Sequence, residues 1–582
     1  MSSTTEDLRR QQMEQAEELL FSGPQKTGFA KDLYRGRFRA EAILPYPTLS
    51  PEARLMGDEA VEAVREFAET QIDPDRIDRE ADIPPEVIEG LGKLGVLGMT
   101  ISPEFGGKGF SQQNYCRVME VIGARCASTA VFVNAHHSIG LRALELFGTT
   151  EQKQRWMRPL VTGEQLAAFA LTEPEAGSDA SNVQTRAEPT PDGTAYILNG
   201  EKRYITNGAI AQVLTVMART PAESDPSGKV TAFLVTPDLA GFEVVEARME
   251  KVGIRGTATA RLAFHDMRVP RENVLGDVGR GLNLALTVLD FGRTTFGASC
   301  TGAAKFCIHR AVEHANTRRQ FGKTLGEFGL VREKIAQAAA DTFAMESATY
   351  HTAALIDSGA HDYMLETAML KVFASDALWR IVNDTLQIYG GAGFFTDQPF
   401  ERMMRDARLN LIGEGANDVL RCFIAMVGLR DLGMELQGVL KRPWQVGRML
   451  RIAPRVPTVG PGVASSIAGR LNASARTLSR QIGTFARASQ RALIRHREEI
   501  LDEQFTQARI GDTATELFLS SCVYSRLLNV AADASRPDDK RLRDMETGLL
   551  YMASAHRRNR IRLAALRRND DQQIEQVAER WI

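Results

Sequence analysis

The 582-residue sequence predicts an α+β chain in which a helical block, a β block, a second helical block and a further helical domain follow one another. Three observations lead to this prediction. Apolar residues recur at helical spacing from Ser50 to about Gly163, and again from Gly279 to about Leu429. Between these blocks, short β-branched and aromatic runs are separated by clusters of Gly, Pro and Asp. The chain after residue 430 is helical in pattern and rich in arginine.

Each expected boundary lies where the pattern changes. The first helix should begin at Ser50-Pro51, because serine caps helix N-termini and proline suits the first helical position. In the β block, residues 213–217, 230–235 and 262–269 are predicted to be strands of a small barrel or sandwich. The expected domains are an N-terminal arm over 1–50, an N-terminal α domain over 51–165, a middle β-barrel or sandwich domain over 166–278, a C-terminal four-helix bundle over 279–430 and an additional C-terminal helical domain over 431–582.

The composition excludes several classes of protein. Lys and Arg total 71 against 73 Asp and Glu, so the net charge of −2 predicts no general attraction to nucleic acid. No run reaches the roughly 18 apolar residues that a membrane-spanning helix needs. The six cysteines include no CxxC pair, which predicts reduced thiols and neither a disulfide scaffold nor a redox motif. Because the first residues lack an apolar signal core, we expect a cytoplasmic protein.

Three candidate motifs do not meet their requirements. Gly322-Lys323-Thr324 resembles the end of a P-loop, but Thr317 stands where that motif needs its first glycine. Residues 390–393 read GGAG, which is not the GxGxxG of dinucleotide-binding turns. The adjacent His136 and His137 cannot share one helix face as metal ligands would, and no acidic or cysteine partner stands at ligand spacing. We therefore expect no metal site.

Four segments carry specific signals, in this order along the chain. They are FALTEPEAGSD at 169–179, RYITNG at 203–208, RRQFG at 318–322 and a stretch from 386 to 418 that begins LQIYGG and ends GEGAND. In order and spacing these segments resemble the acyl-CoA dehydrogenase family over about residues 50–430. HREE at 496, DEQF at 502 and RIGD at 509 further resemble the extra C-terminal domain of the very-long-chain branch of that family.

The resemblance implies an FAD cofactor between the β domain and the third block. Arg318 resembles the arginine that reaches across a dimer interface to the flavin's pyrophosphate, a task that suits a bidentate guanidinium. Gln387 with Gly390 and Gly391 resembles the partner subunit's contact with the adenosine half. The expected cofactor-binding residues are Phe169, Leu171, Thr172, Gly177, Ser178, Tyr204, Thr206, Arg318, Gln320, Phe321, Gln387, Gly390, Gly391, Ala416 and Asp418.

Glu414 resembles the catalytic base of the family, which removes the α proton of an acyl-CoA thioester. Some family members carry the base on an earlier helix instead, at the position of Gly292, so Glu414 has no rival here. Asp290 and Arg293 resemble a substrate-facing pair, with Arg293 placed to tune or orient Glu414. The expected substrate-binding residues are Ser178, Asp290, Arg293 and Gly415.

The sequence also departs from the family pattern. Gly413 replaces the usual aromatic residue before the base, and Ala416 replaces a threonine whose hydroxyl would contact the flavin. Tyr204 stands where the family usually has tryptophan. Ser128 and Ala130 stand where very-long-chain members carry glycines that line the acyl tunnel, and both are small. These departures leave the base in place and put the shape of the acyl chain in doubt.

A basic segment occupies residues 432–497. Between Leu436 and Arg497 the chain has no Asp or Glu, while Lys441 and eleven arginines give this window a charge of +12. An apolar stripe begins at Leu432 and continues past Trp444, a pattern that suits a helix on an anionic membrane surface. Internal packing of the stripe is the alternative. A nucleic-acid site is not favoured, because the segment lacks interleaved aromatic residues and any known motif.

The expected activity is FAD-dependent α,β-dehydrogenation of a long-chain or bulky acyl-CoA to the trans-2-enoyl-CoA. An electron-transfer flavoprotein is the expected electron acceptor, and a homodimer the expected assembly. The location is expected to be cytoplasmic, with a peripheral contact at the inner face of a membrane. An assembly or scaffold protein that retains the fold is the alternative from another class, and an acyl-CoA oxidase is a third.

Overall fold

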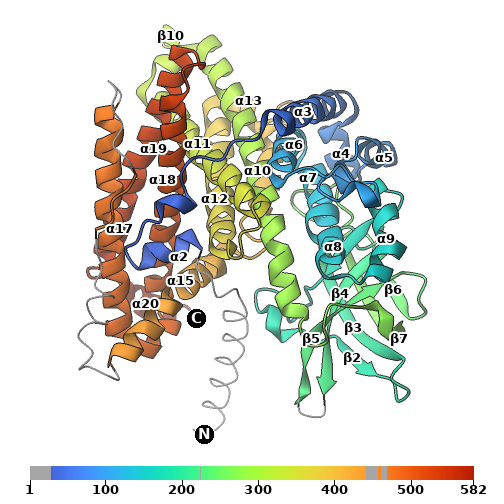
Figure 1. Cartoon of the computed structure of the whole chain (residues 1–582). Helices are drawn as coiled ribbons and strands as arrows, with labels where there is room; N and C mark the ends of the chain where they lie inside the picture. Colours follow the sequence, from blue (N-terminus) through green and yellow to red (C-terminus); the bar gives the residue numbers. More distant parts are fainter. Residues whose placement is uncertain (1–27, 223–224, 441–455, 461–467) are drawn as a thin grey trace. The chain divides into compact units, whose positions relative to one another are not determined.

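The computed structural model describes residues 28–222, 225–440, 456–460 and 468–582 (Figure 1). Among these residues the chain forms two compact units. The first unit contains residues 49–307 and 382–414, and the second contains residues 28–48, 308–381 and 415–582. The division falls within two long helices, α10 (Gly281–Thr317) and α12 (Met364–Tyr389).

The first unit begins with the predicted helical block. The Ser50 hydroxyl accepts a hydrogen bond from the Ala53 backbone nitrogen at 3.1 Å, and Pro51 is the first helical residue, which confirms the predicted start. The helices of this block are α3 (Pro51–Gln71), α4 (Pro74–Glu80), α5 (Pro85–Lys93), α6 (Gln112–Arg125), α7 (Ala127–Val133), the π-helical η4 (Asn134–Leu141), α8 (Arg142–Phe147) and α9 (Thr150–Thr162).

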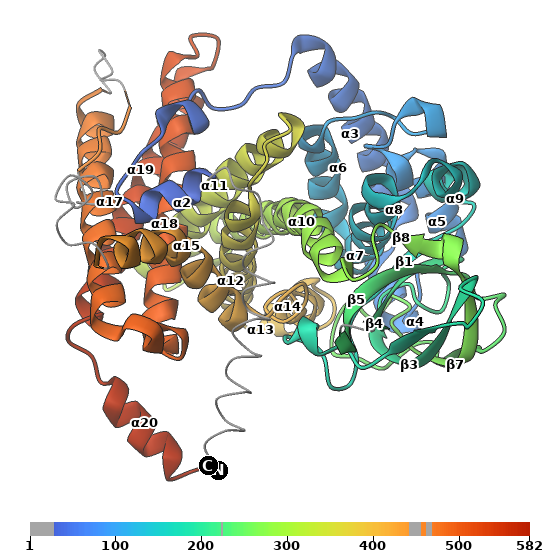
Figure 2. The ribbon, with the colours of Figure 1, turned by 60° about the horizontal axis from the view of Figure 1, so that its bottom comes forward.

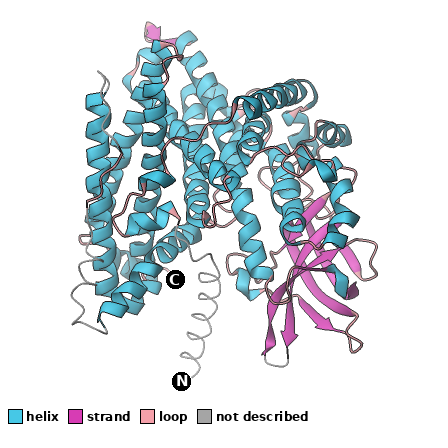
Figure 3. Cartoon of the chain, viewed as in Figure 1, coloured by secondary structure: helices cyan, strands magenta, loops and turns pink. Residues whose placement is uncertain are grey.

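The β block forms one sheet whose strands gather in a single region of the unit (Figure 3). Strand order in the described part of the chain is β6-β7-β3-β2-β4-β5-β8, and β1 pairs in parallel with β4. The three predicted strand segments lie within β4, β5 and β7. The strands are β1 (Ala167–Ala170), β2 (Arg186–Pro189), β3 (Ala195–Ile205), β4 (Val213–Ala222), β5 (Asp225–Val235), β6 (Phe242–Glu246), β7 (Ala260–Pro270) and β8 (Val274–Leu275).

Alternating residues of the central strands enter two different cores. On β4, Leu214 and Val216 pack with Phe233 and Phe264 in a cluster made by the sheet itself, whereas Met217 packs with residues of α8, α9 and the start of α10. Side chains alternate between the two faces of a strand, so β4 is buried on both sides. The sheet thus curves around its own core, as the predicted barrel or sandwich requires, and helices cover its other face (Figure 2).

Helices return after the sheet, as predicted. The first unit adds the beginning of α10, the end of α12, α13 (Gly391–Phe394) and α14 (Phe400–Leu409). The second unit contains the remainder of α10 and α12 with α11 (Gly329–Asp357) and α15 (Asn417–Leu440). Between α10 and α11, β9 (Arg319–Gln320) and β10 (Lys323–Thr324) form a short antiparallel hairpin.

The second unit also holds the extra helical domain, whose helices α17, α18 and α19 lie side by side (Figures 1 and 2). Helix α18 is buried along almost its whole length, because α11, α15, α17 and α19 all pack against it. The helices of this domain are α17 (Ala468–His496), α18 (Gln504–Ala532), α19 (Asp538–Ala565) and α20 (Asp571–Glu579).

The described part of the expected N-terminal arm is packed structure. Helix α2 (Phe29–Tyr34) lies against α15, α17 and α18. The Tyr34 ring meets Phe485 edge-on at 4.9 Å, and its hydroxyl donates to the Ile424 carbonyl oxygen at 2.8 Å. Residues 28–48 are therefore part of the core of the second unit; the rest of the expected arm, residues 1–27, lies outside the described residues.

Several described apolar residues of the basic segment face inward, whereas Met434, Val456 and Ile494 are exposed. Leu432 is 1% exposed, and Leu471, Leu478, Ile482 and Phe485 of α17 are buried as well. For these residues, internal packing is what the structure supports. The central part of the predicted membrane stripe, in 441–455, and residues 461–467 lie outside the described residues. No helix in the described ranges is long and apolar enough to cross a membrane.

Candidate functional site

Glu414 lies in the turn that joins α14 to α15, and the backbone there is unusual. Glu414 has a φ of 57° and Gly415 a φ of 98°, so two successive residues adopt left-handed conformations. Glycine takes this conformation without penalty, but a residue with a side chain does so at a cost of roughly 1–3 kcal/mol. Strain of this kind collects at functional sites, because the surrounding structure must hold the side chain in one direction.

The Glu414 carboxylate is held by Asn134. The Asn134 side-chain amide donates to Glu414 Oε1 at 2.7 Å, and the Thr295 hydroxyl donates to Asn134 Oδ1. The Ser138 and Thr295 hydroxyl oxygens are 3.0 Å apart, and Tyr115 Oη lies 3.2 Å from Ser138 Oγ. Since Thr295 occupies the amide oxygen, this chain of hydrogen bonds aims the amide nitrogen at the carboxylate.

Gly292 of α10 lies directly beside the carboxylate. A Cβ atom at residue 292 would lie 3.3 Å from Glu414 Oε2 and 3.1 Å from the end of the Ile139 side chain. Position 292, the family's alternative place for the base, thus points into the space that the Glu414 carboxylate uses. The hydrogen bond from Asn134 to Glu414 was not predicted from the sequence.

Asn134 escaped the sequence analysis because no motif includes it. It begins the π-helical segment η4, and π-helical turns are frequent at functional sites. The only pattern noted there was His136-His137. Their rings bind the backbone, with His136 Nε2 3.0 Å from the Leu160 carbonyl oxygen and His137 Nδ1 2.9 Å from that of Leu97.

Burial keeps both of these histidines neutral. Desolvation lowers the pKa of His136 to about 4, and desolvation followed by the charge of Arg142 lowers the pKa of His137 well below its usual range. Two neutral rings with backbone partners have a structural role. The described ranges also contain no cluster of His, Cys, Asp and Glu that would hold a metal ion.

Asp290 and Arg293, the expected substrate-facing pair, are buried and pair with each other. Arg293 Nη1 lies 3.1 Å from Asp290 Oδ1, one turn apart on α10. Arg293 thus pairs with Asp290, whereas the hydrogen bond to the Glu414 carboxylate described above comes from Asn134. The role of Arg293 in orienting Glu414 stays a prediction.

The residues expected around the flavin ring gather where β1 ends. The Arg203 backbone nitrogen donates to the Thr172 carbonyl oxygen at 2.9 Å, which brings the 169–172 and 203–206 segments together. A bulge in β3 follows Lys202, and Tyr204 there has a φ of 62° and a ring that is 57% exposed. The Tyr204 side chain is thus exposed next to this junction, with the Arg203 guanidinium 4.8 Å from the centroid of its ring.

A buried ion pair fixes the loop that follows β1. Lys202 Nζ lies 2.6 Å from Glu173 Oε1 and donates to the Leu171 carbonyl oxygen at 3.0 Å. Glu173 also accepts from the backbone nitrogens of Gln184 and Thr185, at 2.5 and 3.1 Å. The pair thus ties both ends of the loop that carries Gly177 and Ser178, which are exposed. Sequence analysis missed this pair.

The remaining expected cofactor residues lie at the surface of their own units. In the first unit, Gln387, Gly390 and Gly391 are exposed, and a Cβ atom at either glycine would meet nothing within 4 Å. In the second unit, Arg318 and Gln320 are exposed, and the Phe321 ring is 93% exposed. Open backbone and a surface guanidinium fit contacts with a phosphate-bearing cofactor, including one held partly by another subunit.

The turn after Glu414 is anchored by a buried lysine. Lys371 of α12 donates to the Gly415 carbonyl oxygen at 2.6 Å and to Asn417 Oδ1 at 2.9 Å, and Ser375 and Asp376 complete the contacts of Asn417. Ala416 is half-buried, whereas the Asp418 side chain is fully exposed. Like the Asn134 contact with Glu414, the Lys371 contact with Gly415 is not indicated by any local sequence motif.

Comparison with known proteins agrees with this geometry. Residues 57–164, 168–267 and 279–429 match the N-terminal, middle and C-terminal domains of acyl-CoA dehydrogenase. Residues 469–581 match the ACAD9/ACADV C-terminal domain.

Relatives in sequence and similar solved structures also include acyl-CoA dehydrogenases. The chain is 37% identical over 516 residues to the human mitochondrial very long-chain specific acyl-CoA dehydrogenase, covering 86% of this chain and 78% of that protein. Its fold is similar to an FAD complex of an acyl-CoA dehydrogenase from Bacillus anthracis, with a TM-score of 0.77, 27% identity and 94% coverage of both chains. Butyryl-CoA dehydrogenase from Megasphaera elsdenii gives a TM-score of 0.62 at 33% identity, covering 66% of this chain and all of that one. The chain therefore belongs to the acyl-CoA dehydrogenase family of FAD-dependent enzymes.

Proposed function

We propose that this enzyme dehydrogenates a long-chain or bulky acyl-CoA to its trans-2-enoyl-CoA, with Glu414 removing the α proton. The observation that carries the proposal is the carboxylate of Glu414, held by Asn134 beside Gly292. A general base must reach the proton that it removes within about 3 Å, so a carboxylate fixed in one direction suits this task. FAD, when bound, supplies the redox chemistry by accepting the β hydrogen as hydride.

The chain's own residues would hold the cofactor in the following way. Backbone amides and hydroxyls from Phe169 to Thr172 and at Thr206 meet the polar rim of the flavin, and Tyr204 supplies a flat contact. Gly177 and Ser178 meet the pyrophosphate or the substrate. Arg318, with Gln320 and Phe321, and Gln387, with Gly390 and Gly391, reach a cofactor bound by the partner of a homodimer. Their exposure in this chain supports that role.

The absence of a side chain at Gly413, next to the base, supports a bulky substrate. A Cβ atom at Gly413 would meet only Leu409, at 3.8 Å, so the aromatic ring usual in the family is replaced by space. Ser128 and Ala130 are both 3% exposed, and the Ser128 hydroxyl accepts from the Gly256 nitrogen at 3.3 Å. Both side chains are small, so neither position would block a tunnel for a long acyl chain.

Anaerobic flavin bleaching tests the proposal. We expect the purified flavoprotein to lose its flavin absorbance when mixed with long or branched acyl-CoAs, and to respond more slowly to butyryl-CoA. A yellow protein that no saturated acyl-CoA reduces would contradict the dehydrogenase proposal, and the alternative of an assembly or scaffold protein with this fold would then lead. An acyl-CoA oxidase would bleach as well, but its reduced flavin would reoxidise rapidly in air.

The assignments of partners and location are part of the same proposal. An electron-transfer flavoprotein is the proposed electron acceptor, and its addition should speed turnover of the reduced enzyme. A cytoplasmic location with a peripheral contact through 432–497 is also proposed, supported by the acid-free positive charge of residues 436–497. Sedimentation with anionic vesicles tests the membrane contact.

Asn134 is proposed as a positioning residue, and Asn134→Ala should show it. A hydrogen bond to a charged group contributes about 1.5–3 kcal/mol, so the rate of flavin reduction should fall about tenfold to a hundredfold. The acidic limb of the pH–rate profile should move to higher pH, because the lost amide favoured the ionised carboxylate. Thr295→Val should give a smaller change in the same direction. An unchanged pH profile measured by stopped flow would rule out this role.

A further inference from the structure

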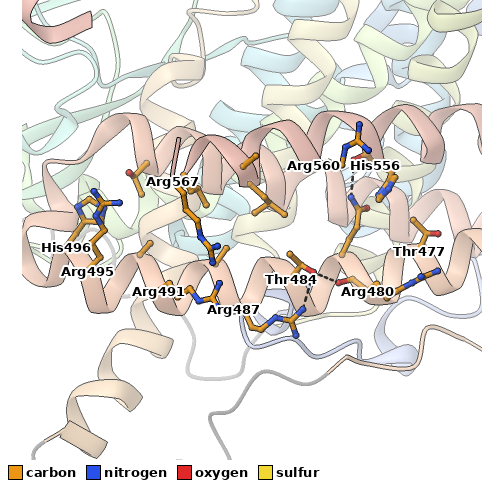
Figure 4. Close-up of a pocket in the computed structure, with 17 residues that line it drawn as sticks. Thr477, Arg480, Thr484, Arg487, Arg491, Arg495, His496, His556, Arg560 and Arg567 are labelled. Atoms are coloured by element: carbon orange, nitrogen blue, oxygen red, sulfur yellow. Dashed lines mark hydrogen bonds between the residues drawn. The ribbon is translucent and has the colours of Figure 1, made fainter. Parts of the chain in front are cut away.

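A groove of about 840 Å³ runs between α17 and α19 in the extra helical domain (Figure 4). Arginines converge on it from both helices. Arg480, Arg487, Arg491 and Arg495 come from α17, Arg560 comes from α19, and Arg567 lies in the turn just after α19. On α17 their spacing of seven, four and four residues places them on one helix face, and Figure 4 shows Arg567 reaching across towards that face.

Within the described part of the chain, no carboxylate balances the positive charge of the arginines in this groove. The residues that line it include no Asp or Glu, and none of the six arginines forms an ion pair with a carboxylate of the described residues. At one end, Glu503 Oε1 lies 3.3 Å from His496 Nδ1. The lining arginines therefore repel one another without a neutralising partner.

Several other arginines of the same domain are paired. Arg509 meets Asp571 at 2.5 Å, Arg526 meets Glu346 at 2.8 Å and Arg558 meets Glu516 at 2.6 Å. An ordinary solvated surface would mix the two signs of charge, as these pairs do. Carboxylates thus lie against several arginines elsewhere in the domain, whereas none lines the groove.

The positive charge of the groove also acts on His556, which lines the groove together with Arg560. Burial lowers the pKa of His556, and the nearby charges of Arg560, Arg480 and Arg557 lower it further. Its backbone carbonyl oxygen accepts from Gln481 across the groove floor at 3.2 Å. A site that disfavours one more positive charge is a site that favours an anion.

The groove also has an apolar component. Ala488 and Ala492 of α17 and Leu563 and Ala564 of α19 line the groove together with the arginines. An inorganic anion would use the arginines alone, whereas a ligand with both a phosphate and an apolar part would use the whole groove. Planar guanidinium groups suit phosphate because they form two parallel hydrogen bonds to it.

We propose that the groove between α17 and α19 is a second ligand site, separate from the residues around Glu414, that binds an amphiphile with one or more phosphate groups and an apolar chain. Its phosphate groups would lie among Arg487, Arg491 and Arg567, and its apolar chain would cover Ala488, Ala492 and Leu563. The proposal does not depend on the dehydrogenase activity.

Calorimetric titration of the full-length flavoprotein tests it. The probes are dihexanoyl phosphatidic acid below its micellar concentration, dihexanoyl phosphatidylcholine as the zwitterionic control, sodium tripolyphosphate, and phosphatidylcholine vesicles with and without phosphatidic acid. The groove variant is Arg487→Gln with Arg491→Gln. The matched control is Arg470→Gln with Arg476→Gln, which removes the same charge from the same helix at positions that do not line the groove. Thermal midpoint and flavin content show that both variants are folded.

We expect phosphatidic acid to bind the wild-type protein and the control, and to bind the groove variant at least about tenfold more weakly, since two charge-assisted contacts are lost. Binding of the monomeric probe identifies a free ligand as the source, and groove-dependent binding to vesicles alone identifies a lipid headgroup; both support the site. Equal weakening in the two double variants, or no binding of any phosphate probe, would overturn it. Equal affinity for tripolyphosphate and phosphatidic acid would remove the apolar part of the proposal.

Discussion

Replacing Glu414 with glutamine should give a folded, yellow protein whose flavin no acyl-CoA reduces at a useful rate. Glutamine preserves the shape of the side chain and can still meet Asn134, but it cannot take a proton. General-base catalysis contributes roughly 10²–10⁴-fold, so the rate of flavin reduction in anaerobic stopped flow should fall by about that factor. Glu250→Gln makes the same chemical change at an exposed residue of the first unit and should react like the wild type.

A base moved to position 292 offers a stronger test. A Cβ atom there would lie 3.3 Å from Glu414 Oε2, so Gly292→Glu combined with Glu414→Gly should return a carboxylate to nearly the same place. We expect partial recovery of flavin reduction over Glu414→Gly alone.

Near wild-type rates in Glu414→Gln would show that another group takes the proton. If Glu414→Gln loses its flavin, its rate of flavin reduction gives no information about the base, so the flavin content of this variant must be measured first.

Replacing Lys202 with methionine should strongly destabilise the first unit. The Lys202 side chain is fully buried and that of Glu173 is 2% exposed. Removing one partner of a buried ion pair leaves the other charge without compensation, which costs about 3–5 kcal/mol. The thermal midpoint should fall clearly at a fixed scan rate. Lys229→Met, which alters an exposed lysine of β5, should change it little.

The same pair predicts a result for the double variant. Lys202→Met with Glu173→Gln removes both charges, and the glutamine oxygen can still accept from the backbone nitrogen of Gln184 or Thr185. The double variant should therefore be more stable than Lys202→Met alone. Flavin occupancy should follow the same order, because the pair holds the loop with Gly177 and Ser178. A midpoint for Lys202→Met within about a degree of the wild type would be evidence against a structural role of the pair.

Much of the fold could be predicted because its signals are local. The start of α3 depends on Ser50, Pro51 and Ala53, which are neighbours in the chain. The strands within 213–235 were predicted from short β-branched and aromatic runs bounded by Gly, Pro and Asp clusters. Hydrogen bonds and side-chain directions inside one element depend on residues a few positions apart, so a single sequence contains them.

The site could be predicted only where a motif contained it. Glu414 was predicted because its segment resembles that of the family, but Asn134 holds it from 280 positions away. Lys371 and Lys202 likewise act on turns at a distance in the sequence. Nothing near these residues in the chain distinguishes an asparagine or lysine with a buried partner from one at the surface. That difference arises when elements pack and water leaves.

The basic segment shows the same division. The sequence alone determined that residues 436–497 carry +12 without an acid, and that the chain has the motifs of an FAD-dependent dehydrogenase. Only the tertiary structure decided which arginines converge, because the groove brings Arg560 of α19 and Arg567 of the following turn together with the arginines of α17. It also decided that the apolar side of α17 faces the core. The sequence gives the net charge of a segment. Packing decides which charged side chains lie close together and which side chains lose contact with water.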